Sequence, residues 1–189
     1  KQKTAYEIMP SLVGSEMCIR DRFMTKATTE QDLYIKIKEA FNSASWEFRE
    51  IPDKRVIEAE FEAHHAKVPL HAQSFEELMA ISVVSRLSFS ILPKSMRSAL
   101  DALMRTNITL NLGNFEANTV NGEVYFRITN VFPDYNFNPE IVTSLVRVAI
   151  VEMDRVTPFL SELNKNPNQP IAQLLERKDL LPEFENEGS

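Results

Sequence analysis

Hydrophobic and polar residues alternate along several short stretches of the chain, which is the pattern of half-buried β-strands. The clearest stretch runs from Ile57 to Ala63, where every second residue is apolar and glutamates occupy the positions between them. Less regular alternation, or in one case a longer apolar run at Leu78–Leu92, predicts further strands elsewhere in the chain. These strands cover Trp46–Ile51, Lys67–Gln73, Leu78–Leu92, Ile108–Ala117 and Val124–Ile128.

Glycine and proline add detail to these strands. The alternation that begins at Ile108 changes phase at Gly113, and we interpret this as a β-bulge, because one extra residue turns the side chains that follow to the other face. The pair Asn121-Gly122 predicts a type I′ hairpin turn. Pro69 has no N–H, so its strand is expected at an edge of the sheet, or with that position turned outward.

A spacing of three and four residues between apolar positions predicts three main helices. The first covers 28–42, with Thr28 or Thr29 as its cap, and the second covers 93–106. The third begins at Asn138-Pro139-Glu140, which combines a capping side chain, a proline in the first turn and an acid near the helix dipole. Its predicted apolar stripe consists of Val142, Val146, Ala149, Met153, Val156, Leu160 and Leu163.

The expected order of elements is α-β-β-β-α-β-β-α. Short turns between consecutive strands predict an antiparallel sheet of about five strands, and helices packed on one face make it an α+β domain. This domain is expected over 23–165. Residues 166–189 are expected to hold a short helix at 171–178 and an acidic tail that begins at Leu181.

The composition is that of a globular protein, with 189 residues of which 43% are hydrophobic and 25% are charged. The net charge of −6 argues against binding to nucleic acid or to an anionic membrane surface. Every long apolar stretch is interrupted by charge before it reaches the ~20 residues of a membrane span. We therefore expect a cytoplasmic protein.

Residues 1–22 resemble a translated sequencing-library adapter rather than a native segment. A common flow-cell primer read in one frame gives Lys1–Glu7, and a transposase-type primer read in the same frame gives Leu12–Asp21, with the length of a usual index between them. We therefore expect this segment to be disordered and exclude it from the fold. Cys18, the single cysteine, falls inside it, so we expect no disulfide and no thiol chemistry.

Catalytic motifs of the common enzyme classes are missing from the sequence. There is no G-x-S-x-G elbow for a nucleophilic serine. Gly113 and Gly122 are the only glycines between Phe23 and the C-terminal tail, and both are needed for hairpins, so no loop fits the phosphate-binding patterns. We therefore expect no catalytic residues and no cofactor.

Two alternatives involve the hairpin around His64. His64 and His71, with Glu62 as a third ligand, could hold a metal ion and make the protein a small hydrolase or another metal-dependent enzyme. Glu58, Glu60 and Glu62 could include a general acid and a general base, because side chains two apart on a strand lie ~7 Å from one another. The competing interpretation of both patterns is a solvated, polar strand face, which we favour.

Aromatic residues form the candidate partner-binding surface. Phe132, Tyr135 and Phe137 lie together in one loop, and Tyr125 is expected on the outer face of the sheet. Exposed aromatic side chains near a sheet edge suit recognition of a polypeptide by strand addition or in a hydrophobic groove. The competing interpretation is that the loop aromatics cap the core.

An ordered set of motifs between Trp46 and Leu163 resembles the YbjN family of bacterial proteins. The motifs are Leu110-Asn111-Leu112-Gly113-Asn114-Phe115-Glu116, Asn121-Gly122-Glu123-Val124-Tyr125-Phe126-Arg127, and Glu152-Met153-Asp154-Arg155 followed by Pro158. The resemblance implies a fold like that of type III secretion chaperones, which are small α+β domains, often homodimeric and without enzymatic activity. The family is described as regulators of sensory transduction and offers no catalytic residues to transfer.

Together these observations favour a non-enzymatic binding module that holds a partner polypeptide, chaperone-like or regulatory. Homodimerisation is expected through the 93–105 helix or through the broad face of the last helix. No nucleic acid, membrane or metal ion is expected among its partners.

Overall fold

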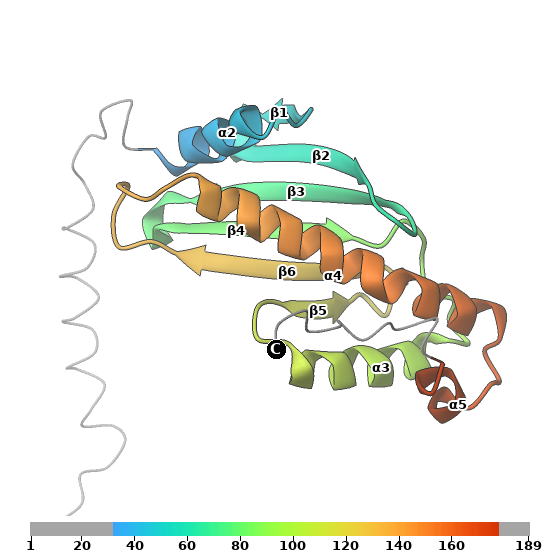
Figure 1. Ribbon diagram of the computed structural model, residues 1–189. Coiled ribbons are helices and arrows are strands. Elements are labelled where there is room, and N and C mark those ends of the chain that lie inside the picture. Colours follow the sequence, from blue (N-terminus) through green and yellow to red (C-terminus); the bar gives the residue numbers. More distant parts are fainter. Residues whose placement is uncertain (1–31, 178–189) are drawn as a thin grey trace, which may run out of the picture. The chain divides into compact units, whose positions relative to one another are not determined.

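Six strands form one antiparallel sheet in the computed structural model, which describes residues 32–177 (Figure 1). The strands are β1 (Arg49–Ile51), β2 (Val56–Glu62), β3 (Lys67–Phe75), β4 (Ala80–Arg86), β5 (Asn114–Ala117) and β6 (Val124–Val131), in the spatial order β1-β2-β3-β4-β6-β5. The helices are α2 (Leu33–Ser43), α3 (Met96–Thr109), α4 (Glu140–Lys165) and α5 (Ile171–Leu175), with single 3₁₀ turns at Pro52–Lys54 and Glu76–Leu78. The α+β class with an antiparallel sheet is thus confirmed. The adapter-like segment 1–22, the cap at Thr28 or Thr29 and the tail from Leu181 lie outside the described residues.

Helix α4 crosses β3, β4 and β6, and α2 packs on β2 and β3 and against α4 (Figure 1). The Oγ of Ser85 on β4 donates a hydrogen bond to the carbonyl of Ala149 on α4 at 2.7 Å, which identifies the helix-covered side of the sheet as the inner face. Helix α3 has a different position, because it packs along the edge strand β5. The remaining face of the sheet, the outer face, therefore carries the other half of each strand's side chains.

The apolar stripe predicted for the last helix is buried along its full length. All seven of its predicted residues are buried in α4, which confirms that prediction. On β3 the same side of the sheet receives Val68, Leu70 and Ala72, at alternate positions. Phe41, Phe126 and Phe159 are the largest fully buried side chains. Burial of one such side chain stabilises the fold by about 1.5–3 kcal/mol relative to an exposed one.

The strand count and order differ from the expectation. The strand predicted at Trp46–Ile51 forms β1 and pairs with β2, so four strands precede α3, whereas the expected order counted three. Of the two alternatives given for Pro69, an edge strand is wrong, because β3 lies inside the sheet between β2 and β4. Pro69 pairs with Glu60 of β2, while pairing with β4 begins one residue later, at Leu70. Pro69 therefore lies one residue outside the β3–β4 ladder, where its missing N–H interrupts no hydrogen bond of that ladder.

The strand expected to reach Leu92 ends at Arg86, and the chain then leaves the sheet. It is held there by the N–H of Ile91, which donates to the carbonyl of Gly122 at 2.7 Å. This close approach explains the glycine at position 122. A Cβ atom there would lie 2.3 Å from the carbonyl oxygen of Ile91, and φ is +78°.

The turn between β5 and β6 is not of type I′, which needs a positive φ at both central residues. Among the non-glycine residues of 32–177, only Ser45, Arg55 and Met79 have a positive φ, so Asn121 does not. The loop instead spans 119–122 and is closed by the N–H of Asn118, which donates to the carbonyl of Glu123 at 2.8 Å.

The predicted bulge at Gly113 is also wrong, because α3 continues to Thr109 and Ile108 is helical. Alternation at 108, 110 and 112 suggested a strand, but Ile108 also lies four residues after Met104, and the helical spacing prevails. Gly113 follows in a loop with φ +73°. A Cβ atom at this position would lie 2.4 Å from Cζ of Phe126, so the glycine allows the loop to approach β6.

Candidate functional site

Charged and polar side chains cross the outer face of the sheet in rows. In one row, Arg49 of β1 lies opposite Glu58 of β2, which in turn lies opposite His71 of β3. The same row continues through Val84 of β4 to Arg127 of β6. Arg49 and Glu58 form an ion pair. The row therefore has opposite charges on neighbouring strands, an arrangement that stabilises sheet pairing.

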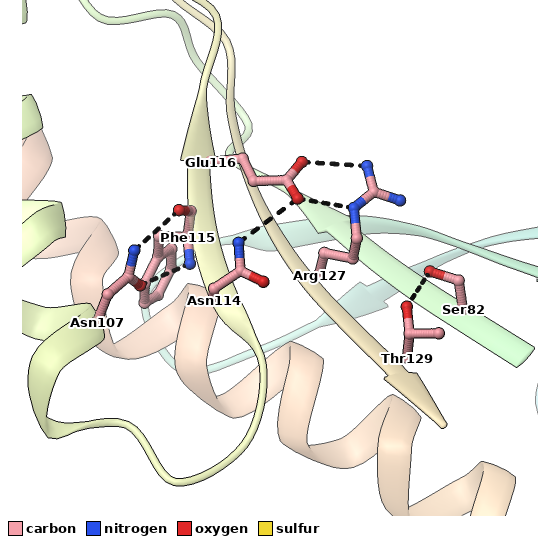
Figure 2. A network of polar contacts seen from close by, with 7 residues as sticks. All are labelled: Ser82, Asn107, Asn114, Phe115, Glu116, Arg127 and Thr129. Carbon is pink, nitrogen blue, oxygen red and sulfur yellow. Dashed lines mark hydrogen bonds and ion pairs between the residues drawn. The ribbon is translucent and has the colours of Figure 1, made fainter. Parts of the chain in front are cut away.

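Figure 2 shows the end of this face at β5 and β6. The guanidinium of Arg127 holds Glu116 with two hydrogen bonds, Nε to Oε1 at 2.8 Å and Nη2 to Oε2 at 3.1 Å. These bonds lower the pKa of Glu116 and raise the pKa of Arg127. Two residues further along β6, the hydroxyl of Thr129 donates to the hydroxyl of Ser82 on β4 at 2.9 Å. The polar groups at this end of the sheet thus bond to one another.

A concavity of ≈ 560 Å³ lies over the outer face and extends from β1 to β4 and β6. Its lining comprises Arg49, Glu58, Ala59, Glu60, Pro69, Leu70, His71, Arg86 and Tyr125. The two arginines of this lining are each paired with a glutamate, Arg49 with Glu58 and Arg86 with Glu123. The lining contains no serine, threonine or cysteine that could act as a nucleophile. Its charges are therefore balanced, and its chemistry is that of a polar surface.

His71 is the most deeply placed titratable group of this concavity. Burial lowers its pKa, and the positive charge of Arg127 lowers it further, while Glu58 acts in the opposite direction. The imidazole is therefore kept neutral over a wider pH range than an exposed histidine.

The structure does not bring His64, Glu62 and His71 together. His64 lies in the turn after β2, where its ring contacts the ring of His65. Glu62 pairs with Lys67 at 2.7 Å. Within residues 32–177, no three His, Cys, Asp or Glu side chains are grouped so that they could hold a metal ion. The metal-dependent alternative therefore gains no support from the geometry.

The three glutamates of β2 lie in surface ion pairs. Glu58 pairs with Arg49, and Glu60 and Glu62 both lie near Nζ of Lys67. An acid and base pair for hydrolysis needs two carboxyl groups in different environments, one of which is apolar. The positions of these glutamates match the competing interpretation, a solvated strand face.

The aromatic loop after β6 packs onto the core. Phe132 is only 3% exposed and stacks on Phe137, with ring centroids 3.8 Å apart. Tyr135 is half-buried, and its hydroxyl donates to Oε2 of Glu76 at 3.3 Å. Phe132 therefore cannot present its ring to a partner, and the loop caps one end of the core.

Tyr125 lies apart from this loop, on the outer face as expected. Its hydroxyl donates to Oε2 of Glu123, and this bond raises the pKa of the tyrosine. The four aromatic residues of the predicted binding surface thus do not form one patch.

The edge strand β5 is closed by a side chain of α3, as Figure 2 shows. The amide of Asn107 accepts a hydrogen bond from the N–H of Phe115 at 2.7 Å and donates one to its carbonyl at 3.0 Å. These are the two bonds that a residue on an added strand would make. At the opposite edge β1 has only three residues, Arg49–Ile51. Both edges are thus poor sites for strand addition.

Helix α3 carries an exposed apolar surface whose residues sequence analysis did not single out, although it named this helix as a dimer interface. Leu100 is half-buried, Met104 is 60% exposed and Ile108 is 82% exposed, at intervals of four residues along one side of the helix. Leu112, which follows the helix, is 60% exposed. We call these four residues the α3 stripe. The spacing of four was the available signal, but Ile108 was predicted to belong to a strand.

Comparisons with known proteins add no relatives. No protein-family model matches the chain, and the search of curated proteins finds no significant similarity.

None of the helices within residues 32–177 combines the length and the apolar character that crossing a membrane requires.

Proposed function

We propose that this protein is a non-enzymatic binding module that holds a partner polypeptide, in a chaperone-like or regulatory role. The α3 stripe is its docking surface, and its exposure is the observation that carries the proposal. The resemblance to the YbjN family and to the type III secretion chaperone fold belongs to the same proposal.

The α3 stripe supports this role because its apolar residues are aligned rather than scattered. Single exposed apolar residues are common on protein surfaces, but an aligned set marks an interaction site. The opposite side of α3 is anchored by buried Ala99, Ala102 and Leu103, so the helix presents Met104 and Ile108 on a fixed backbone. Apolar residues at this spacing suit packing against another helix or in an apolar groove.

A second copy of the chain is one partner that fits this surface. Asp101 and Arg105 lie beside the stripe and form an exposed ion pair with one another at 3.0 Å. In an antiparallel pair of α3 helices, each Arg105 comes within reach of the partner's Asp101 while the stripes meet. Homodimerisation is therefore part of the proposal.

Photo-cross-linking in the host cell tests this proposal. A benzoylphenylalanine at position 108 should give adducts with another polypeptide, and Met104→Glu in the same chain should abolish them. The matched control carries the cross-linker at Val120, which is 94% exposed in the loop before β6. Equal adducts from positions 108 and 120, or none from either, would show that the α3 stripe is not a docking surface.

A further inference from the structure

The described chain ends close to the start of α3. Arg177 pairs with Oε1 of Glu162 in the last turns of α4, with 3.4 Å between the atoms. The next residue of α4, Leu163, accepts a hydrogen bond from the hydroxyl of Ser95 at 3.1 Å, and Ser95 is the N-cap of α3. Residues 95 and 177 are therefore attached to adjacent positions of one helix.

The segment 178–189 is long enough to reach the whole α3 stripe from this point. An extended chain spans up to about 3.3–3.6 Å per residue, so these residues can cover roughly 40 Å. The helical part of the stripe, from Leu100 to Ile108, is about 12 Å long at a rise of 1.5 Å per residue. The segment 178–189 is therefore long enough to contact the whole α3 stripe.

The composition of this segment complements α3. Its apolar residues are Leu180, Leu181 and Phe184, and its acidic residues are Asp179, Glu183, Glu185 and Glu187, against one basic residue, Lys178. On α3 and in the turn before it, the stripe is accompanied by Lys94, Arg97 and Arg105, against one acid, Asp101. The segment thus combines apolar residues with an excess of negative charge, and the stripe combines apolar residues with an excess of positive charge.

We infer that residues 178–189 bind the α3 stripe of their own chain and compete there with the partner polypeptide. This inference rests on the proposed function, because it concerns the regulation of the same surface. A short tether holds the segment at an effective concentration on the order of millimolar. Even a weak contact is then populated within the chain, and a partner must displace it to bind.

The cross-linker at position 108 of the purified full-length chain tests the inference. We expect an intrachain cross-link that mass spectrometry maps to residues 178–189, with a yield that stays constant across a dilution series. Leu181→Ser combined with Phe184→Ser should abolish this cross-link and increase the partner adduct in cells. Asn186→Ser, in the same segment, is the matched control and should change neither.

Other outcomes separate this inference from the proposed function. Adducts of twice the monomer mass, with a yield that rises with concentration and no intrachain product, would overturn the cis contact and leave the docking surface intact. An intrachain cross-link that persists while no partner is ever captured would overturn the regulatory role and the proposed function together. If the double serine variant keeps the cross-link, the apolar contact with Leu181 and Phe184 is refuted.

Discussion

Asp154 of α4 and His65 of the β2–β3 turn are in direct contact although 89 positions separate them in the sequence. One carboxylate oxygen accepts the N–H of His65 at 2.8 Å, and the other lies 3.0 Å from Nδ1 of the same residue. The N–H of Ala66 also donates to this carboxylate, at 3.3 Å. The carboxylate therefore attaches the tip of the β2–β3 hairpin to the helix that covers the inner face.

Replacement of Asp154 should destabilise the protein through this attachment. We expect Asp154→Ala to lower the free energy of unfolding by about 1–3 kcal/mol, because hydrogen bonds to a charged group are lost. His65→Ala should cost less, since the two backbone N–H groups still reach the carboxylate. Urea unfolding of both variants measures the difference. An equal loss in the two variants would mean that the imidazole, rather than the backbone, makes the attachment.

Because Asn107 closes the β5 edge, two substitutions at this position should lower the free energy of unfolding by different amounts. Asn107→Ala removes both bonds to Phe115 and should cost about 1–2 kcal/mol of unfolding free energy. Asn107→Asp keeps an acceptor for the N–H of Phe115 but cannot donate to its carbonyl, so an intermediate loss is expected. Chemical denaturation gives the ranking, and light scattering against concentration reports whether the opened edge associates. A fully stable Asn107→Ala variant would contradict the role given to this amide.

Gly113 should tolerate no side chain. Gly113→Ala places a Cβ atom 2.8 Å from the carbonyl oxygen of Arg127, at a position where φ is already +73°. Strain of this kind costs on the order of 1–3 kcal/mol before the steric clash is added. The melting temperature of the variant should fall clearly, whereas Val120→Ala, at an exposed position, should leave it unchanged. Equal melting temperatures in all three proteins would argue against the close approach of this loop to β6.

The lowered pKa of His71 predicts a dependence of stability on pH. The unfolded chain binds a proton near pH 6.5, whereas the folded chain binds it only at lower pH. Stability from this group is therefore complete above pH 6.5 and is lost as the pH falls toward the folded pKa. His71→Gln should flatten the curve of unfolding free energy against pH in that window. Parallel curves for the two proteins would show that His71 is not the group that titrates.

Local patterns predicted the parts of the fold in which one face of an element is buried. The glutamates of β2 and the apolar stripe of α4 are such cases, because the period of two or of about 3.6 residues directly reflects the buried side. The α3 stripe could not be predicted in this way. Met104 and Ile108 have the same spacing as core residues, and only the packing of α3 against β5 decides which side is left exposed.

Local patterns also could not predict the contacts of the polar and aromatic residues in the candidate site. The sequence identifies Phe132 as an aromatic residue in a loop, but its burial depends on the stacking with Phe137 and on the end of the core beneath it. The pairing of His65 with Asp154 depends on how α4 crosses the sheet. Such contacts arise from tertiary structure, and no local pattern encodes them.

The amide of Asn107 also affects whether the sheet recruits strands of other chains in a crowded cell. A sheet with open edges recruits the strands of nascent and misfolded chains and can grow into insoluble fibrils. At the β5 edge of this protein, the amide of Asn107 already occupies the N–H and the carbonyl of Phe115. One side chain thus takes the place of a seventh strand and closes this edge to such chains.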